Sequence, residues 1–337
     1  MDKALLEKTA RAMVAQGKGL LAADESSGTC EKRFKSVNVP CTEENRRDYR
    51  ELLFSTPNVA EYISGVILYD ETLRQKTKDG VPMAEYLNKL GIIPGIKVDG
   101  GAKALAMCPG EQVTEGLDGL RERLKEYFEL GARFAKWRAV INISKDIPST
   151  ACIEANAHAL ARYSALCQEA NIVPIVEPEV MLDGDHSIER CFEVSEATLR
   201  ALFNALAEQK VSLEHVVLKA SMVLSGNKAA NRAGVEEVAQ RTLECLKRTV
   251  PAALPGVVFL SGGQTDEEAT AHLDAMNRIG SAPWPLTYSY SRALQAAALK
   301  AWSGQAGNVK NAQQAFHHRA KMNSLASQGK WSSALEK

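Results

Sequence analysis

The 337-residue sequence predicts a single α/β domain folded as a closed (β/α)8 barrel, the TIM-barrel architecture. Eight short apolar runs, each suited in length to a buried strand, alternate with longer segments in which apolar residues recur at helical spacing. The competing architecture, an open doubly wound sheet, would place a GxGxxG loop after its first strand. Here the first run leads into Asp24-Glu25-Ser26-Ser27-Gly28, and no phosphate-binding GxxxxGKS or GxxxxGKT loop occurs. The closed barrel is therefore favoured.

In chain order, the expected strands are residues 19–23, 63–69, 92–98, 134–141, 172–176, 216–219, 257–260 and 286–290. The stretches between them show helical spacing, as in Leu117, Leu120 and Leu124. Thr42 and Thr265 each precede acidic residues in patterns that resemble capping boxes, so helices should begin there. The barrel is expected over residues 1–302. The polar, glycine-containing segment 303–337 is expected to form a flexible C-terminal tail.

The composition excludes several classes of protein. Hydrophobic residues make up 45% of the chain and charged residues 24%, which is typical of a soluble globular protein. Lys plus Arg and Asp plus Glu balance at 41 each, so no overall charge favours nucleic acid or a membrane surface. The N-terminus lacks an apolar signal core, and no run reaches the 18 apolar residues of a membrane span. We expect a cytoplasmic protein without nucleic-acid or membrane partners.

Neither the cysteines nor the histidines form a metal-binding pattern. The cysteines are odd in number and scattered without a CxxC pair, which indicates reduced, structural thiols. The histidines have no ligand spacing, so we expect no metal. We also expect no cofactor. The seven cysteines are at positions 30, 41, 108, 152, 167, 191 and 245, and the six histidines at 158, 186, 215, 272, 317 and 318.

Charged and small polar residues gather where the expected strands end. Because active sites of (β/α)8 barrels lie at the carboxyl ends of the strands, these side chains should meet around one cavity. Residues two apart on a strand face the same side, which pairs Lys136 with Arg138 and Glu177 with Glu179. In order, the strand ends carry Asp24, Tyr69-Asp70-Glu71, Lys97 with Asp99, Lys136 with Arg138, Glu177 with Glu179, Lys219, Ser261-Gly262-Gly263 and Ser291-Arg292.

Lys219 is the most unusual of these residues because it lies within the apolar run 215–223. Lysine is rarely buried unless it is paired, so one interpretation is a lysine that reaches solvent or forms an ion pair. The other is a desolvated amine used as a nucleophile. For one lysine alone the first interpretation is favoured. Lysines at three strand ends, together with carboxylates and a Ser-Gly-Gly turn, favour the second, although Asp99 or Glu179 could serve only to orient Lys97 or Lys136.

Several motifs together closely resemble those of class I fructose-bisphosphate aldolase, and they occur in the same order over nearly the whole chain. They are Leu21-Ala22-Ala23-Asp24-Glu25-Ser26, Glu43-Glu44-Asn45-Arg46-Arg47, Gly95-Ile96-Lys97-Val98-Asp99, Phe134-Ala135-Lys136-Trp137-Arg138, Val176-Glu177-Pro178-Glu179, Leu218-Lys219, Phe259-Leu260-Ser261-Gly262-Gly263-Gln264 and Ser289-Tyr290-Ser291-Arg292-Ala293-Leu294-Gln295. The resemblance implies a (β/α)8 barrel, assembled as a homotetramer. It also implies cleavage of fructose 1,6-bisphosphate to dihydroxyacetone phosphate and glyceraldehyde 3-phosphate without a metal.

The resemblance also implies roles for individual residues. Lys219 resembles the Schiff-base lysine and Lys136 the second lysine, whose ammonium would favour the neutral amine that imine formation needs. Glu177 would donate and accept protons during imine formation, Asp24 would accept the C4 hydroxyl proton, and Glu179 would support them. The implied substrate and phosphate contacts are Ser261, Gly262, Gly263, Ser291 and Arg292 at the C1 phosphate, Ser26, Arg33, Arg46 and Lys97 at the C6 phosphate, and Arg138.

Three departures from the family pattern stand out. The usual Leu-Lys-Pro-Asn run is Leu218-Lys219-Ala220-Ser221 here, the usual Tyr-Gly-Arg is Tyr290-Ser291-Arg292, and the terminal tyrosine of the animal enzymes is missing. Two alternatives also stay open. Another Schiff-base barrel, such as a transaldolase or a deoxyribose-phosphate aldolase, would use the same lysine chemistry. A non-catalytic scaffold could keep the aldolase fold without turnover.

Overall fold

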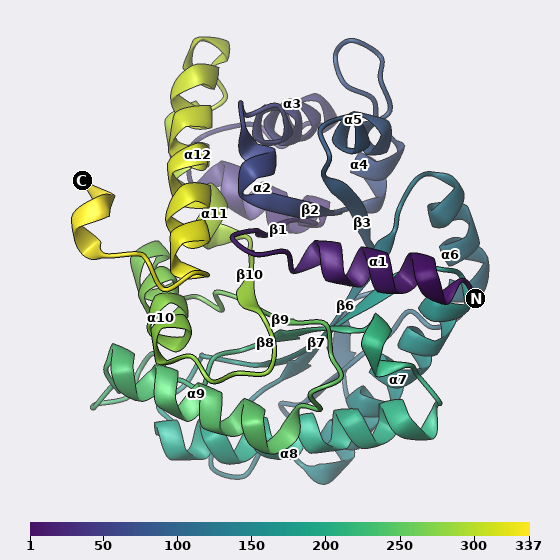
Figure 1. Cartoon of the computed structure of the whole chain (residues 1–337), viewed down its shortest axis with the longest axis vertical. Helices are drawn as coiled ribbons and strands as arrows, with labels where there is room; N and C mark the ends of the chain where they lie inside the picture. The colour runs from purple at the N-terminus through teal and green to yellow at the C-terminus, as the bar shows by residue number, and fades with distance from the viewer.

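The computed structural model describes residues 1–337 and contains a closed barrel of eight parallel strands, ordered β1-β10-β9-β8-β7-β6-β3-β2 (Figure 1). This arrangement confirms the predicted (β/α)8 barrel. The barrel strands are β1 (Gly19–Ala23), β2 (Ile63–Leu68), β3 (Ile93–Lys97), β6 (Phe134–Ile141), β7 (Val173–Val180), β8 (Val217–Ala220), β9 (Val257–Phe259) and β10 (Leu286–Tyr290). A separate antiparallel pair, β4 (Ala102–Ala104) and β5 (Gln112–Thr114), is inserted between β3 and β6.

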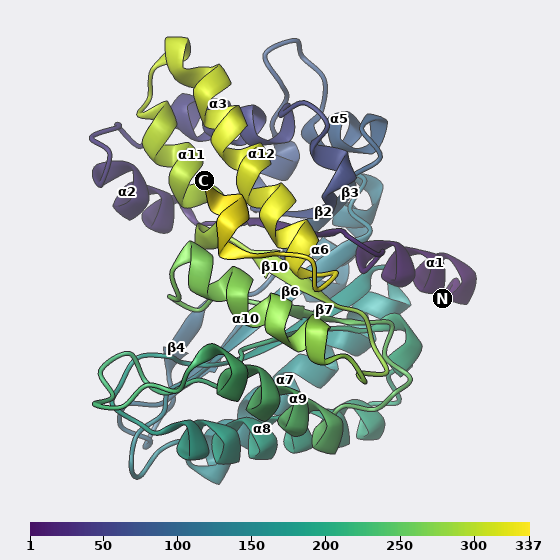
Figure 2. The same cartoon turned by 60° about the vertical axis from the view of Figure 1, so that its left-hand side comes forward.

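Helices surround the barrel (Figures 1 and 2). They are α1 (Lys3–Met13), α2 (Ser27–Lys35), α3 (Glu43–Phe54), α4 (Asp70–Arg74), α5 (Met83–Lys89), α6 (Leu120–Glu129), α7 (Thr150–Glu169), α8 (Ile188–Glu208), α9 (Val235–Thr249), α10 (Asp266–Ile279), α11 (Arg292–Trp302) and α12 (Val309–Ala326). Short 3-10 turns are η1 (Val59–Glu61), η2 (Leu213–His215), η3 (Ala306–Asn308) and η4 (Ser333–Glu336). None of these helices is apolar over a stretch long enough to cross a membrane.

Three strands have the predicted bounds, whereas β7 is longer than expected. The sequence predicts an end at Val176, and Pro178, two residues later, has no N–H to donate to a ladder. In the structure β7 pairs with β8 only through Ile175 and Val176, so Pro178 lies beyond that ladder. The pairing with β6 continues to Val180, and this extension carries Glu177 and Glu179 within regular strand.

The two predicted helix starts are confirmed, but only one is a full capping box. At α10, the Thr265 side chain accepts from the Glu268 N–H, and the Glu268 side chain accepts from the Thr265 N–H. At α3, Thr42 accepts from the Asn45 N–H, while the Asn45 side chain donates to the Pro40 carbonyl. The reciprocal bond is absent at α3 because Asn45 stands where a capping box needs Glu or Gln.

Helix α1 closes one end of the barrel. Its Leu6, Ala10 and Met13 form one apolar cluster with inward-facing residues near the strand starts, among them Phe134. The Phe134 ring also explains Gly95, since a Cβ at that position would lie 2.2 Å from the ring. Apolar side chains therefore fill the interior at the start of the strands, which leaves the opposite end for polar chemistry.

The structure differs from the expected flexible tail over residues 309–326. Helix α12 packs against α11, α10 and α3 (Figure 2). Phe316 and Ala320 on it are fully buried. After the helix, the Trp331 N–H donates to Asp274, and Arg319 donates to Glu336 at 2.6 Å. The sequence suggested a tail because its apolar residues are few, but small alanines allow the helix to pack closely.

Candidate active site

A cavity of about 560 Å³ opens at the carboxyl ends of the barrel strands. Its 24 lining residues include all the predicted site residues except Arg46 and Gly263. The predicted residues that line it are Asp24, Ser26, Arg33, Lys97, Lys136, Arg138, Glu177, Glu179, Lys219, Ser261, Gly262, Ser291 and Arg292. The barrel thus brings together side chains that lie far apart in the sequence.

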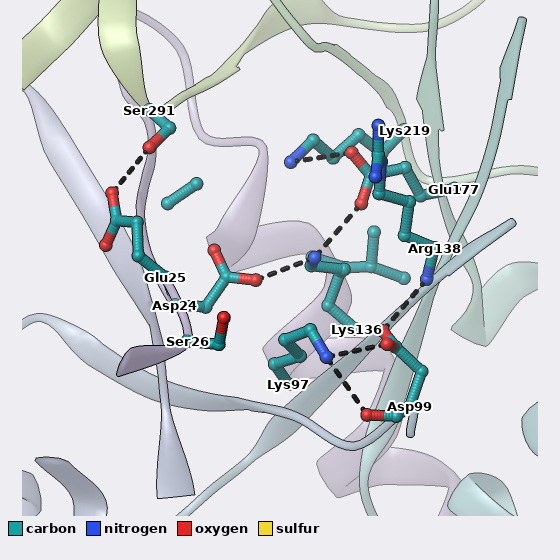
Figure 3. A network of polar contacts seen from close by, with 12 residues as sticks. Asp24, Glu25, Ser26, Lys97, Asp99, Lys136, Arg138, Glu177, Lys219 and Ser291 are labelled. Carbon is teal, nitrogen blue, oxygen red and sulfur yellow. Dashed lines mark hydrogen bonds and ion pairs between the residues drawn. The ribbon is translucent and has the colours of Figure 1, made fainter. Parts of the chain in front are cut away.

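Four charged side chains form a continuous chain at the base of the cavity (Figure 3). Lys219 Nζ lies 3.0 Å from Glu177 Oε1, and Glu177 Oε2 lies 3.3 Å from Lys136 Nζ. Lys136 Nζ lies 2.6 Å from Asp24 Oδ2. Lys219, Glu177 and Lys136 are each at most 4% exposed, so these ion pairs are shielded from water. A protein interior accommodates such deeply buried charges when each lies beside a group of opposite charge.

The strand register explains how these residues meet. Arg138 on β6 lies opposite Glu177 on β7, and Val176 lies opposite Leu218 on β8, which sets Glu177 beside Lys219. Lys136 precedes Arg138 by two positions and therefore faces the same interior. Asp24 follows directly after the last residue of β1 and reaches Lys136 across the barrel.

The paired charges shift the acidities of the group. Burial alone would raise the pKa of Asp24, but the ammonium groups of Lys136 and Lys219 outweigh it and lower the pKa to about 2. Glu177 likewise has a lowered pKa, since the same two lysines outweigh its burial. Burial would lower the pKa of Lys136, but Asp24, Glu177 and Asp99 raise it overall. At neutral pH, Lys136 is a fixed cation between two carboxylates.

A second set of charges surrounds this chain. Arg138 forms an ion pair with Glu179, so Glu179 orients an arginine rather than Lys136. Lys97 Nζ donates to Asp99 Oδ1 at 2.6 Å, and the other Asp99 oxygen accepts from the Arg138 N–H at 3.2 Å. Asp99 therefore holds Lys97 at the cavity wall, the supporting role that the sequence left open for it.

Glu25 is a site residue whose role is not evident from the sequence. Its carboxylate pairs with Arg33 and accepts from Ser291 Oγ at 2.7 Å and from Gln295 Nε2 at 2.9 Å. Arg33 also donates to Ser291 Oγ at 2.9 Å. The only signal in the sequence was the position of Glu25 in the Asp24–Ser26 motif. Ser291, which replaces the glycine of the family pattern, thereby connects α11 to the segment that leads into α2.

The turn after β9 has the backbone shape that its glycines predict. Gly262 has φ +56° and Gly263 φ +93°, a region that side chains other than glycine seldom adopt. Gly263 does not line the cavity, but a Cβ placed on it would lie 3.6 Å from Arg292 Nη2. The turn and the guanidinium are therefore neighbours, as an anion site made of both would require.

Arg46 lies outside this cavity, in contrast to its expected place among the phosphate contacts. Both ends of its guanidinium are engaged by Glu71, with Nε to Oε1 at 2.8 Å and Nη2 to Oε2 at 2.5 Å, and Nη1 donates to the Cys41 carbonyl. It lines a different depression, beside α2. A bidentate carboxylate partner fixes the arginine geometrically and explains its absence from the cavity.

The substitutions after Lys219 are accommodated without disturbing the strand. Ala220 is the last residue of β8, and its carbonyl accepts from the Leu260 N–H. Ser221 Oγ donates to the Val180 carbonyl at 3.0 Å, which ties the end of β8 to the end of β7. No group of three or more His, Cys, Asp or Glu side chains in the structure could hold a metal ion.

Comparison with known proteins decides the family. A family model described as "Fructose-bisphosphate aldolase class-I" matches residues 5–337. This chain belongs to the class I fructose-bisphosphate aldolase family. Class I aldolases are metal-independent lyases, so the predicted enzyme class is confirmed.

Individual relatives agree with this assignment. The chain is 66% identical over 327 residues to a probable fructose-bisphosphate aldolase class 1 of Xanthomonas campestris, covering 97% of this chain and 98% of that protein. It is 54% identical over 314 residues to a cytosolic fructose-bisphosphate aldolase of Arabidopsis thaliana, covering 93% and 80% of the two chains. Among solved structures, the fructose-bisphosphate aldolase of Plasmodium falciparum, in complex with TRAP and an inhibitor, superposes with a TM-score of 0.97 at 48% identity. That match covers 98% of this chain and 96% of the other.

Proposed function

We propose that this class I aldolase reversibly cleaves fructose 1,6-bisphosphate to dihydroxyacetone phosphate and glyceraldehyde 3-phosphate through a Schiff base on Lys219. The observation that carries the proposal is the buried chain Lys219–Glu177–Lys136–Asp24, which combines an amine with two carboxylates and a fixed cation. The family assignment supports the substrate class, sugar phosphates.

The first half of the reaction is imine formation. The Lys219 ammonium first passes one proton to Glu177, 3.0 Å away, and the resulting amine attacks the C2 carbonyl. A second proton moves from the nitrogen to the carbonyl oxygen and gives a carbinolamine. Glu177 then returns its proton to the C2 hydroxyl, which departs as water. The product is an iminium that withdraws electrons from the C3–C4 bond.

The second half is cleavage of that bond. A carboxylate removes the proton from the C4 hydroxyl, the C3–C4 electron pair moves toward the iminium nitrogen, and the aldehyde leaves an enamine. Asp24 is the proposed base, and its lowered pKa keeps it ionised at neutral pH. The Lys136 ammonium, 2.6 Å away, orients the carboxylate and stabilises negative charge near the reacting atoms.

The two phosphates would occupy opposite sides of the cavity. Backbone N–H groups of the Ser261–Gly263 turn and Ser291, with the Arg292 guanidinium, are the proposed C1-phosphate contacts. Ser26, Arg33 and Lys97 are the proposed contacts for the C6 phosphate, with Arg138 between the two groups. All of these except Gly263 line the same cavity.

We further propose a cytoplasmic homotetramer. The assembly follows from the family resemblance, and the compartment from a relative that is named cytosolic. Light scattering of the purified protein should give the mass of four 36.6 kDa chains.

Turnover tests the proposed function. The purified protein should cleave fructose 1,6-bisphosphate in excess EDTA, and deoxyribose 5-phosphate should be a far poorer substrate. Cleavage that is lost in EDTA and restored by zinc would contradict the proposed metal-free reaction. Preference for deoxyribose 5-phosphate would favour another Schiff-base aldolase, and no turnover at all would favour a scaffold.

A further inference from the structure

Two buried side chains, Gln264 and His272, hold the Ser261–Gly263 turn from the side away from the cavity. Neither residue lines the cavity, and they are 6% and 4% exposed. We propose that they are positioning residues that fix the turn in its anion-binding shape before substrate arrives. This inference rests on the proposed role of the turn at the C1 phosphate.

Gln264 closes the turn with two hydrogen bonds to one acceptor. Its backbone N–H donates to the Ser261 carbonyl at 3.0 Å, and its side-chain Nε2 donates to the same oxygen at 2.9 Å. A carbonyl oxygen facing a bound phosphate would repel it. Two donors hold the Ser261 oxygen toward Gln264, which leaves the amide groups of the turn to face an anion.

His272 fixes the orientation of the Gln264 amide. Because Nε2 of Gln264 donates to Ser261, Oε1 is the atom that faces His272 Nδ1, 2.6 Å away. Two acceptors would repel at that distance, so Nδ1 carries the proton and donates. Burial lowers the pKa of His272 to about 4, so the ring is neutral at pH 7, with its proton on Nδ1.

The turn needs such support because of its own composition. Gly262 and Gly263 both have positive φ, and glycine has the widest conformational freedom of all residues. Ordering a flexible turn when phosphate binds would weaken binding by the entropy lost. His272 projects from α10, whose capping box begins at Thr265, so a rigid helix supports the turn through one amide.

The test compares His272→Leu, which removes the donor, with His272→Asn, whose amide can donate to Gln264. For His272→Leu, KM for fructose 1,6-bisphosphate and for fructose 1-phosphate should rise about tenfold, as for the loss of one hydrogen bond in a phosphate site, while kcat stays within about twofold. In His272→Asn, both KM values should return most of the way to those of the wild type. Gln264→Met lacks the side-chain hydrogen bonds to Ser261 and to His272. It should raise both KM values at least as much as His272→Leu does.

Thr270→Val is the matched control for lost helix stability. It removes a buried hydroxyl on the same helix, which accepts from Arg319 Nη2 at 2.6 Å and lies 2.7 Å from the Asp266 carbonyl to which it can donate, without touching the turn. The melting temperature should fall while both KM values stay unchanged. Wild-type turnover tests the proposed function separately. If the wild type is inactive, titration of each variant with dihydroxyacetone phosphate gives the same comparison.

Four results would overturn the inference. The first is an unchanged KM, or unchanged binding of dihydroxyacetone phosphate, in His272→Leu. The second is an equal loss in the Leu and Asn variants, and the third is a KM increase in Thr270→Val that follows its loss of stability. A rise in KM for fructose 1,6-bisphosphate but not for fructose 1-phosphate would also contradict it, because the turn would then serve the C6 phosphate.

Discussion

Glu177 lies between two lysines, with Oε1 3.0 Å from Lys219 Nζ and Oε2 3.3 Å from Lys136 Nζ. One carboxylate therefore contacts both the proposed nucleophile and the cation that is held by Asp24. This arrangement separates two tasks. Glu177 can exchange protons with the Lys219 amine, while Lys136 remains charged because its pKa is raised by its carboxylate neighbours.

Replacing Lys136 with methionine should slow catalysis without removing the nucleophile. The variant lacks the ammonium that orients Asp24, and kcat should fall by about 10² to 10⁴, the usual contribution of positioned acid–base groups. Steady-state kinetics measures this loss. Lys219 should still form a reducible adduct, more slowly. A kcat within about threefold of the wild type would remove Lys136 from the mechanism.

The lowered pKa of Asp24 predicts a change in stability at acid pH. Its folded-state pKa of about 2 lies below the ordinary value of 3.8, so the unfolded chain binds this proton first as pH falls. The ion pair contributes stability that is complete above about pH 4 and is lost as pH falls toward 2. This contribution is about 2 kcal/mol of unfolding free energy.

Asp24→Asn isolates that contribution. Urea unfolding at pH 5 and at pH 2 should show that the difference in unfolding free energy between the wild type and the variant shrinks by about 2 kcal/mol at the lower pH. A difference that stays constant between these pH values would show that the Asp24 pKa is not lowered by folding.

Ser291→Gly should change substrate binding more than catalysis. The glycine restores the family pattern but removes the hydroxyl that donates to Glu25 and accepts from Arg33. If the backbone N–H of residue 291 is what contacts phosphate, KM should change by a few-fold at most and kcat should stay nearly constant, as for uniform binding. A collapse of kcat in steady-state assays would mean that the Ser291 hydroxyl takes part in the chemistry.

Arg33 and Arg46 provide a matched pair of arginines near α2. Arg33 lines the cavity, whereas Arg46 is engaged by Glu71. Arg33→Met should raise KM for fructose 1,6-bisphosphate about tenfold or more, since a charge-assisted contact to phosphate is lost. Arg46→Met should lower the melting temperature and leave KM within about twofold. The reverse ranking of the two KM values would show that Arg46 binds the substrate.

Much of the barrel and its central charges could be predicted from the sequence because both depend on local signals. Apolar runs bounded by polar residues define strands, and a lysine inside such a run, Lys219, is locally anomalous. Since all strand ends of a parallel barrel lie at one face, Asp24, Lys136 and Glu177 could be brought together without knowing any contact.

The parts that the sequence did not reveal depend on partners distant in the chain. Glu71 engages the guanidinium of Arg46, which lies outside the cavity, and Glu25 acquires its role only through Arg33 and Ser291. The buried face of α12 was missed because its contacts are made by small residues such as Ala320. These features depend on contacts between residues that are distant in the chain, and neither composition nor residue spacing specifies such contacts.

Trapping the covalent intermediate tests the central claim, that Lys219 is the nucleophile. The protein is incubated with dihydroxyacetone phosphate and borohydride, which reduces an iminium to a stable secondary amine, and peptide mass spectrometry locates the adduct. We expect the adduct on Lys219, and Lys219→Met, an apolar side chain of similar length, should form none and show no turnover while remaining folded. An adduct on Lys97 or Lys136, with Lys219→Met still active, would contradict the mechanism.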